Sequence, residues 1–331
     1  MTDTRFYEAL GPVAAETLAA GLPIQGHAAL PVGSVAAFGA AEADGLSYLE
    51  GRLKGEPPPL KGCVVASASA APALLAAGAG AVIVAESPRA AFARMLPHLF
   101  RQRLWTDEGP APLVEAGARV SPQAILSPGC AIGAGAVIAP LAVIGPGCAI
   151  GRNTIIGPHV SLQCALIGDG VTIGAGSVIG ERGFGVAGDR GGLVDLPHLG
   201  RVILQDRVSI GAGTTIDRGM LDDTVVGEDS KIDNLCQIAH NVRLGRRVVV
   251  AAFGGISGST VIEDGARLGG RVGIADHRHI GENAQLAAGS AVMHDVPANE
   301  TWGGYPAQPV RAWMRETAWL RRMQRKGDGG Q

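Results

Sequence analysis

The chain has 331 residues, with 50 Gly, 20 Pro and only 4% aromatic side chains. A formal net charge of −2 excludes a protein that binds nucleic acid through an overall positive charge. No run approaches the roughly 18 apolar residues of a membrane span, and no N-terminal signal sequence is visible. We therefore expect a cytoplasmic protein without an integral membrane segment.

Residues 1–104 lack the periodicity of the rest of the chain and are typical of a small α/β domain. The stretches CVVAS (63–67) and AVIVA (81–85) predict strands, and PRAAFARMLPHLF (88–100) predicts an amphipathic helix. Residues 105–117 are polar and contain Pro and Gly, so we expect a linker there.

Aliphatic residues recur every six positions from about residue 118 to residue 300. Neither the helical period of 3.6 nor simple alternation gives this spacing. It is the period of a parallel β-helix, in which each coil has three short faces and each face turns one aliphatic side chain inward. Gly often follows the aliphatic residue, and we expect it to form the turn between faces. The aliphatic positions are Val120, Leu126, Ile132, Ile138, Ile144, Ile150, Ile156, Leu162, Ile167, Ile173, Ile179, Leu204, Ile210, Ile216, Val226, Ile232, Ile238, Leu244, Val250, Ile256, Ile262, Leu268, Ile274, Ile280, Leu286 and Val292.

Two segments interrupt the hexads. Residues 181–201 form a long excursion, and residues 217–224 add a few residues between Ile216 and Val226. An insertion in a solenoid is commonly a tolerated surface loop, but loops on a rigid scaffold are also where binding usually resides.

The cysteines do not suggest a disulfide framework, because their number, 5, is odd. Cys130 and Cys148 lie one coil apart and are expected to stack about 4.8 Å from each other. We interpret them as small stacked residues in a reducing compartment.

Residues 301–331 follow the solenoid, and AWMRETAWLRRMQRK (312–326) predicts a C-terminal helix. The sequence thus predicts a mainly β protein, with an α/β domain before the parallel β-helix and a helical extension after it.

His240, in QIAHNVRLG (237–245), stands two positions after the inward Ile238 and is expected to point away from the core. One coil of 18 residues later the same column holds Gly258, and the next coil holds Asp276. A histidine stacked over a glycine places an imidazole beside an accessible backbone N–H. That pair suits acyl transfer, which needs a base that titrates near neutral pH and a donor for the oxyanion. From spacing alone, an inert surface histidine is the favoured interpretation.

The segment from Gly200 to Gly245 closely resembles the UDP-3-O-acylglucosamine N-acyltransferases of lipid A biosynthesis. The resemblance is carried by TTIDRG, LDDT, IDN and CQIAHNV, together with GFG and DRG in the long excursion. It extends more weakly over nearly the whole chain. It implies a homotrimer of left-handed parallel β-helices, formed by residues 118–300, and a uridine-nucleotide-binding module in residues 1–104.

The resemblance also implies a reaction. A (3R)-3-hydroxyacyl group would pass from acyl carrier protein, where phosphopantetheine carries it, to the 2-amino group of a UDP-3-O-(3-hydroxyacyl)-glucosamine. No other cofactor and no metal are implied. His240 matches the family's general base, and Gly258 matches the residue whose backbone N–H is the oxyanion donor.

Two further residues match substrate-binding positions of the family. His277 matches a second histidine, near the acyl and phosphate groups, whereas His279 has no counterpart and is interpreted as a solvated corner. Tyr48 matches an aromatic residue that stacks on uracil. The family often carries Asn-Pro a few residues later, and this chain has Gly51-Arg52 instead.

The predicted C-terminal helix is strongly basic, with Glu316 as the acidic residue between Arg311 and Lys326. A basic helix is often only a solvated face. Because the implied donor rides on acyl carrier protein, which is acidic, we expect this helix to dock it through Arg321, Arg322 and Arg325.

Three other functions compete for the same scaffold. One is another hexapeptide acyltransferase, either a UDP-GlcNAc O-acyltransferase or a CoA-dependent sugar acetyltransferase. Another is a zinc hydrolyase, which needs three histidines and could draw on His277, His279 and a neighbouring chain's copy of His240. The third is a scaffold without catalytic activity.

Overall fold

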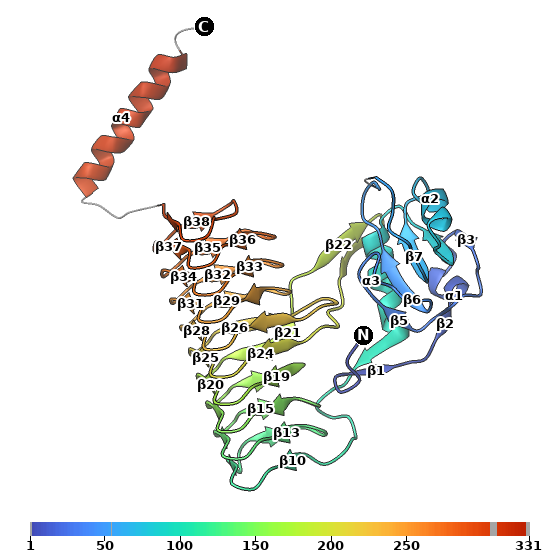
Figure 1. Cartoon of the computed structure of the whole chain (residues 1–331), viewed down its shortest axis with the longest axis horizontal. Helices are drawn as coiled ribbons and strands as arrows, with labels where there is room; N and C mark the ends of the chain where they lie inside the picture. Colours follow the sequence, from blue (N-terminus) through green and yellow to red (C-terminus); the bar gives the residue numbers. More distant parts are fainter. Residues whose placement is uncertain (1, 54, 305–309, 329–331) are drawn as a thin grey trace.

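The computed structural model describes residues 2–53, 55–304 and 310–328, and within the last helix it describes the side chains of residues 314–324. Figure 1 shows a parallel β-helix with the N-terminal domain at its side. One continuous apolar core runs from Phe6 and Phe92 in the domain into the interior of the solenoid. The two parts therefore pack as a single folded body.

The N-terminal domain has a five-stranded sheet in which only the edge strand β3 runs antiparallel to its neighbour. In sheet order its strands are β3 (Ile24–Gly26), β8 (Ala81–Val84), β7 (Cys63–Ala66), β6 (Gly45–Tyr48) and β5 (Ser34–Val35). The helices are α1 (Ala15–Ala19), α2 (Ala71–Ala76) and α3 (Pro88–Leu99). Two antiparallel pairs complete the domain: β1 (Tyr7–Ala9) with β9 (Phe100–Gln102), and β2 (Val13–Ala14) with β4 (Pro31–Val32). The two strands and the helix predicted from sequence are confirmed.

The solenoid consists of three parallel sheets, each built from one short strand per coil. The first sheet contains β10 (Leu113–Val114), β13 (Ala131–Ile132), β16 (Ala149–Ile150), β19 (Ala165–Ile167), β24 (Val202–Leu204), β27 (Thr224–Val226), β30 (Arg243–Leu244), β33 (Val261–Ile262) and β36 (His279–Ile280). The second contains β11 (Arg119–Val120), β14 (Val137–Ile138), β17 (Ile155–Ile156), β20 (Thr172–Ile173), β25 (Ser209–Ile210), β28 (Lys231–Ile232), β31 (Val249–Val250), β34 (Arg267–Leu268), β37 (Gln285–Leu286) and β39 (Thr301–Trp302). The third contains β12 (Ile125–Leu126), β15 (Val143–Ile144), β18 (Ser161–Leu162), β21 (Val178–Arg182), β26 (Thr215–Arg218), β29 (Gln237–Ile238), β32 (Gly255–Ile256), β35 (Gly273–Ile274) and β38 (Ala291–Val292).

The inward aliphatic residues are buried as the hexads predict. In β31, Val250 is 1% exposed, whereas its neighbour Val249 points outward and is 40% exposed. Cys130 and Cys148 are likewise buried, free thiols on adjacent coils. The mainly β class and the parallel β-helix of hexapeptide repeats are confirmed.

The solenoid extends further in both directions than residues 118–300. Strand β10 pairs in register with β13, although its residues were expected to belong to the linker. Val114 in fact lies six residues before Val120. The hexad is weak there because a terminal coil has a neighbour on one side only and leaves Leu113 largely exposed. At the other end, β39 pairs with β37.

The glycine that follows an inward aliphatic does not have the role that the sequence suggested. After Leu244, Gly245 has ordinary backbone angles, and the positive φ falls two residues later, at Arg247 (φ 56°). Gly245 is needed for space, because a Cβ there would lie 2.7 Å from the backbone N of Asp264 on the next coil. Close stacking of coils, rather than a turn angle, explains these glycines.

The long excursion forms a hairpin. After β21, the strands β22 (Val186–Asp189) and β23 (Gly192–Asp195) pair antiparallel and reach the N-terminal domain beside α3 (Figure 1). The chain leaves the coil at Gly180, where φ is 87° and a Cβ would lie 1.6 Å from the carbonyl oxygen of Gln163. Only glycine fits at that exit.

The predicted C-terminal helix is confirmed as α4 (Val310–Asp328). Several of its apolar side chains are exposed, including Met314, Trp319 and Leu320. Among the described residues, no helix combines the length and the apolar character that crossing a membrane requires.

The inward and outward positions of β31 provide a matched test of the core. We expect Val250→Ala to lower the free energy of unfolding by about 2 kcal/mol, because it removes buried methyl groups and leaves a cavity. Val249→Ala, the same substitution one residue earlier, should change it by less than about 0.5 kcal/mol. Urea unfolding followed by circular dichroism measures both. Equal losses in the two variants would contradict the assignment of the inward face.

Candidate functional site

His240 lies at the corner that follows β29, and its ring lies between two glycines. A Cβ on Gly258 would lie 2.8 Å from His240 Cε1, and a Cβ on Gly183 would lie 2.8 Å from His240 Cδ2. Neither position accommodates a side chain without displacing the imidazole. The ring is therefore confined from the next coil on one side and from the excursion on the other.

Asn241 sets the tautomer of His240. Its Oδ1 accepts a hydrogen bond from the Met220 backbone N–H at 3.0 Å, and its Nδ2 donates to the carbonyl of Asp222 at 3.3 Å, which fixes the orientation of the amide. The same Oδ1 lies 3.0 Å from His240 Nδ1. Because a carboxamide oxygen only accepts, Nδ1 carries the proton and Nε2 keeps its lone pair. The arrangement leaves Nε2 as the basic nitrogen.

Gly258 lies beside that basic nitrogen, since its missing Cβ would be 2.9 Å from His240 Nε2. The Gly258 carbonyl accepts a hydrogen bond from the His277 N–H. Among the hydrogen bonds of the described residues, none uses the Gly258 N–H. A base and an unused backbone donor thus stand together, as the column of 18 residues predicts.

Asp217, at the third position of β26, interacts electrostatically with His240. Gln237 Nε2 donates to its Oδ2 at 2.8 Å. Burial raises the pKa of Asp217 to about 6, against the opposing effects of Gln237 and His240. The carboxyl group therefore still carries a negative charge at neutral pH.

The excursion supplies two site residues that the hexads could not predict. Gly183 contacts His240, as described above, and His198 packs edge-on against it with ring centroids 5.0 Å apart and planes at 65°. Both lie outside the repeat, so no column arithmetic connects them with His240. The sequence signals in this segment were the length of the insertion and its GFG motif, which begins at Gly183, and neither indicates a contact with His240.

Tyr48 lines a pocket of about 500 Å³ between the N-terminal domain and the solenoid. On the domain side the pocket includes Phe38 and Glu50. On the solenoid side it includes Asn241 and Arg243. One face of Tyr48 is occupied by Phe92, with centroids 4.8 Å apart, and burial raises the pKa of its phenol. The pocket therefore adjoins the residue that holds His240.

His277 occupies a corner one coil beyond Ser259, in an αL conformation with φ 55°, and its side chain is exposed. It touches the site through its backbone N–H, which bonds to Gly258. His279 is exposed as well, and its Nε2 lies 2.9 Å from Glu263 Oε1. Among the described residues, no group of three or more His, Cys, Asp and Glu is placed to hold a metal ion.

Of the three arginines predicted to dock a carrier protein, Arg321 and Arg322 are exposed on α4. The side chain of Arg325 lies outside the described residues.

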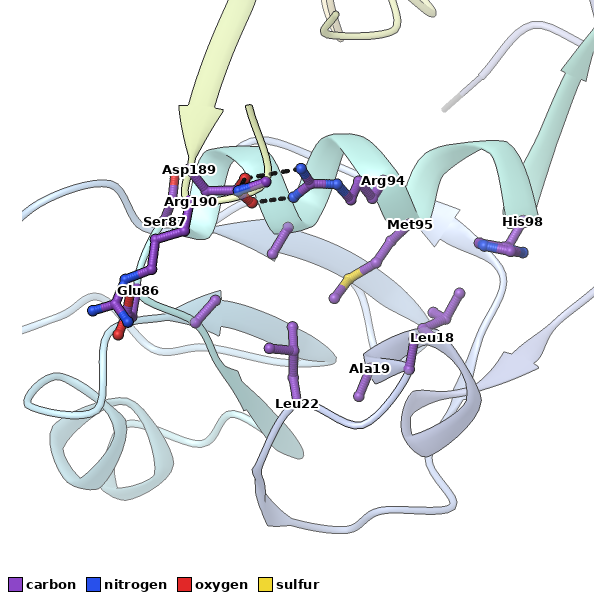
Figure 2. A pocket seen from close by; sticks show the side chains of 14 residues that line it. Leu18, Ala19, Leu22, Glu86, Ser87, Arg94, Met95, His98, Asp189 and Arg190 are labelled. Carbon is purple, nitrogen blue, oxygen red and sulfur yellow. Dashed lines mark hydrogen bonds and ion pairs between the residues drawn. The ribbon is translucent and has the colours of Figure 1, made fainter. Parts of the chain in front are cut away.

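A second pocket, of about 670 Å³, lies where the tip of the β22–β23 hairpin meets the N-terminal domain (Figure 2). Leu18, Leu22 and Met95 form apolar parts of its lining. Asp189 at the hairpin tip bonds to the guanidinium of Arg94 through both oxygens. This contact anchors the far end of the excursion, whose near end holds Gly183 and His198 beside His240.

The solenoid matches a known repeat family. Residues 129–164 and 223–258 match the family model described as bacterial transferase hexapeptide (six repeats). His240 and Gly258 both lie in the second of these segments.

Curated relatives match about half of the chain. It is 59% identical over 158 residues to a UDP-3-O-acylglucosamine N-acyltransferase of Caulobacter sp. (strain K31), covering 48% of this chain and 46% of that protein. It is 52% identical over 167 residues to a protein of the same name from Methylorubrum extorquens (strain PA1), covering 50% and 48%. The chain spans about half the length of the curated relatives it matches.

A solved UDP-N-acetylglucosamine acyltransferase of Francisella novicida is 25% identical, with a TM-score of 0.48, over 58% of this chain and 67% of that one. Two segments of the solenoid thus match the bacterial transferase hexapeptide model, and about half of the chain is similar to UDP-3-O-acylglucosamine N-acyltransferases.

Proposed function

We propose that this protein is an N-acyltransferase that moves a (3R)-3-hydroxyacyl group from acyl carrier protein to the 2-amino group of UDP-3-O-(3-hydroxyacyl)-glucosamine, in lipid A biosynthesis. The observation that carries the proposal is the pairing of an unprotonated His240 Nε2 with the unused N–H of Gly258. The location that goes with this reaction is the cytoplasm, and the cofactor is the carrier's phosphopantetheine alone.

Each half of the pair has a task in the reaction. As the amine attacks the thioester carbonyl, His240 Nε2 takes a proton from the nitrogen, because an amide product cannot form on a fully protonated amine. The Gly258 N–H donates to the carbonyl oxygen as it becomes negative. When the tetrahedral intermediate collapses, the carbon–sulfur bond breaks and the departing thiolate takes the proton from His240.

The pocket beside Tyr48 suits the nucleotide part of the acceptor. Tyr48 and Phe38 supply aromatic surface for a base, and Arg243 supplies positive charge for a pyrophosphate. Asn241 lines the same pocket and holds His240, so a sugar bound there reaches the base. The contact of His277 with Gly258 supports its place near the acyl group and phosphates.

We also propose that three copies assemble into a trimer with sites between neighbouring chains. Leu235 and Phe253 stack on one corner of the solenoid and are each about half exposed. Contiguous exposed apolar side chains are typical of a protein interface.

The catalytic pair is tested by two substitutions. His240→Ala should lower turnover by about 10²-fold or more while leaving fold and assembly intact. Gly258→Ala should have a similar effect, because its methyl group displaces the imidazole. A panel of hydroxyacyl carrier proteins and acetyl-CoA, with mass spectrometry of the products, measures the transfer and separates this reaction from O-acylation and acetylation. Near-normal turnover in His240→Ala would sink the proposal.

Sedimentation analysis tests the assembly. At micromolar concentration the protein should sediment as a homotrimer, and a single species of monomer mass would rule the assembly out. Phe253→Asp should shift the equilibrium toward smaller species, because it places a charge in the apolar corner.

Docking of the carrier protein is tested on α4. Changing Arg321, Arg322 and Arg325 together to Glu should raise the KM for the acyl carrier protein at least about tenfold, with little effect on the KM for the UDP-sugar. The matched variant with Lys at all three positions keeps the charge and should behave like the wild type. Added salt should weaken carrier binding by the wild type. Normal use of the carrier by the Glu variant at low salt would show that α4 is not the docking site.

A further inference from the structure

His198, in the excursion, carries a buried nitrogen without a partner. The side chain is 2% exposed, and its Nδ1 lies 2.9 Å from the carbonyl oxygen of Leu196. Because a carbonyl only accepts, Nδ1 holds the proton and Nε2 presents a lone pair. That Nε2 has no hydrogen-bond partner among the described residues. A buried acceptor left unpaired costs stability, so its persistence requires an explanation.

Several hydrogen bonds hold the backbone of His198 in place. Its carbonyl oxygen accepts hydrogen bonds from Tyr7 Oη at 2.8 Å and from Arg218 Nε at 2.9 Å. The buried Arg218 guanidinium also donates to the carbonyl of Gly180 and to Gln102 Oε1, each at 2.8 Å. Tyr7 of β1 and Arg218 of β26 thus hold this backbone position directly, and Gln102 of β9 supports it through Arg218. The main chain cannot relax to bring Nε2 to a partner.

The unpaired nitrogen of His198 lies close to the ring of His240. A point at the absent Cβ of Gly183 lies 2.9 Å from His198 Nε2 and 2.8 Å from His240 Cδ2. Since residue 183 has no side chain, nothing separates the two rings there. Cδ2 adjoins Nε2 in His240, so the unpaired nitrogen of His198 lies close to the edge of the ring that becomes positive when Nε2 gains a proton.

We propose that His198 is a positioning residue that stabilises the imidazolium form of His240 through the unpaired lone pair of its Nε2. This inference rests on the proposed function, in which His240 takes the proton of the amine. A neutral imidazole facing a cationic one supplies an attractive dipole in a site shielded from water.

The charged groups around the two rings are compatible with this role. Burial, with the positive charges of His240, Arg218 and Arg182, lowers the pKa of His198 to about 4, while the hydrogen bond to the Leu196 carbonyl opposes them. His198 therefore stays neutral at the pH of the reaction and does not compete for the proton. The Asp217 carboxylate, which interacts with both His240 and Glu181, acts in the same direction as the lone pair.

The test is a titration of His240 in the assembled, substrate-free protein, by NMR of selectively ¹³C-labelled histidine. In His198→Leu the lone pair is lost, so the imidazolium is less stable and the pKa of His240 should fall by about 0.5 to 1 unit. A base is active only when deprotonated, so the acidic limb of the kcat/KM profile should move to lower pH by the same amount. Because the base is also weaker, kcat on the plateau should fall about two- to fivefold with KM nearly unchanged.

Matched variants separate this effect from packing. His198→Gln offers an acceptor oxygen in the same place and should restore most of the pKa and of kcat. His279→Leu removes an exposed histidine paired with Glu263 and should leave the profile as in the wild type. If His198→Leu does not assemble, His198→Met, which is unbranched and also lacks an acceptor, enters the same titration.

An unchanged His240 pKa and acidic limb in the Leu or Met variant would overturn the inference, even if turnover fell, because a purely structural role produces that pattern. Failure of the proposed function looks different, since His240→Ala would then keep its turnover. The NMR titration does not depend on activity, so it decides the role of His198 in either case.

Discussion

The interior of the solenoid holds one aliphatic side chain per face of each coil, and this constraint shapes the rest of the molecule. So thin a core closes only if every coil repeats the same cross-section, which keeps successive strands in register, as in the pairing of Ile238 with Ile256. Close stacking in turn demands glycine where the next backbone approaches, as at Gly245. Residues one coil apart become neighbours in space, so the residues of a functional site can lie in one column of the solenoid.

The column of His240 shows how much of the site follows from that constraint. Once the period is known, adding 18 to His240 gives Gly258, and the structure places the absent Cβ within 2.9 Å of the imidazole Nε2. The fold was predictable for the same reason, because a strict six fits no other regular structure. The ends were less predictable, since Val114 lies in a coil with only one neighbour and looks like linker. Gly245 shows what the hexad pattern does not predict. The pattern reveals that glycine recurs after the inward aliphatic residue, but not whether a turn angle or the close approach of the next coil requires it.

The parts of the site that sequence did not predict share a physical origin. Gly183 and His198 lie in a segment without a repeat, and nothing local indicates that its backbone returns to His240. The placement of His198 depends on Arg218, a charged side chain buried where the solenoid, the excursion and the N-terminal domain meet, and bonded to two carbonyls and an amide from distant segments. Neither its burial nor its partners follow from the hexads. The role of Asn241 could not be predicted from the hexads either. It depends on the orientation of the side-chain amide, which hydrogen bonds with the backbone of Met220 and Asp222 fix.

A β-helix alone presents shallow, nearly flat faces, and a histidine side chain on such a face would be fully exposed to solvent. In this protein the periodic part holds His240 and Gly258, the base and the oxyanion donor of the proposed reaction, in fixed register, whereas the aperiodic part covers the ring of His240. The hairpin covers His240 from one side, and its tip is held against α3 by Arg94 and Asp189. Tyr7 and Gln102 tie the N-terminal domain to the same frame, so the domain that lines the nucleotide-sized pocket is connected to the backbone behind the base. The stacking of the coils fixes the distance between His240 and Gly258. The excursion adds His198 beside the same ring and so changes its electrostatic surroundings. Repeat and insertion therefore both contribute to the environment of the His240 imidazole.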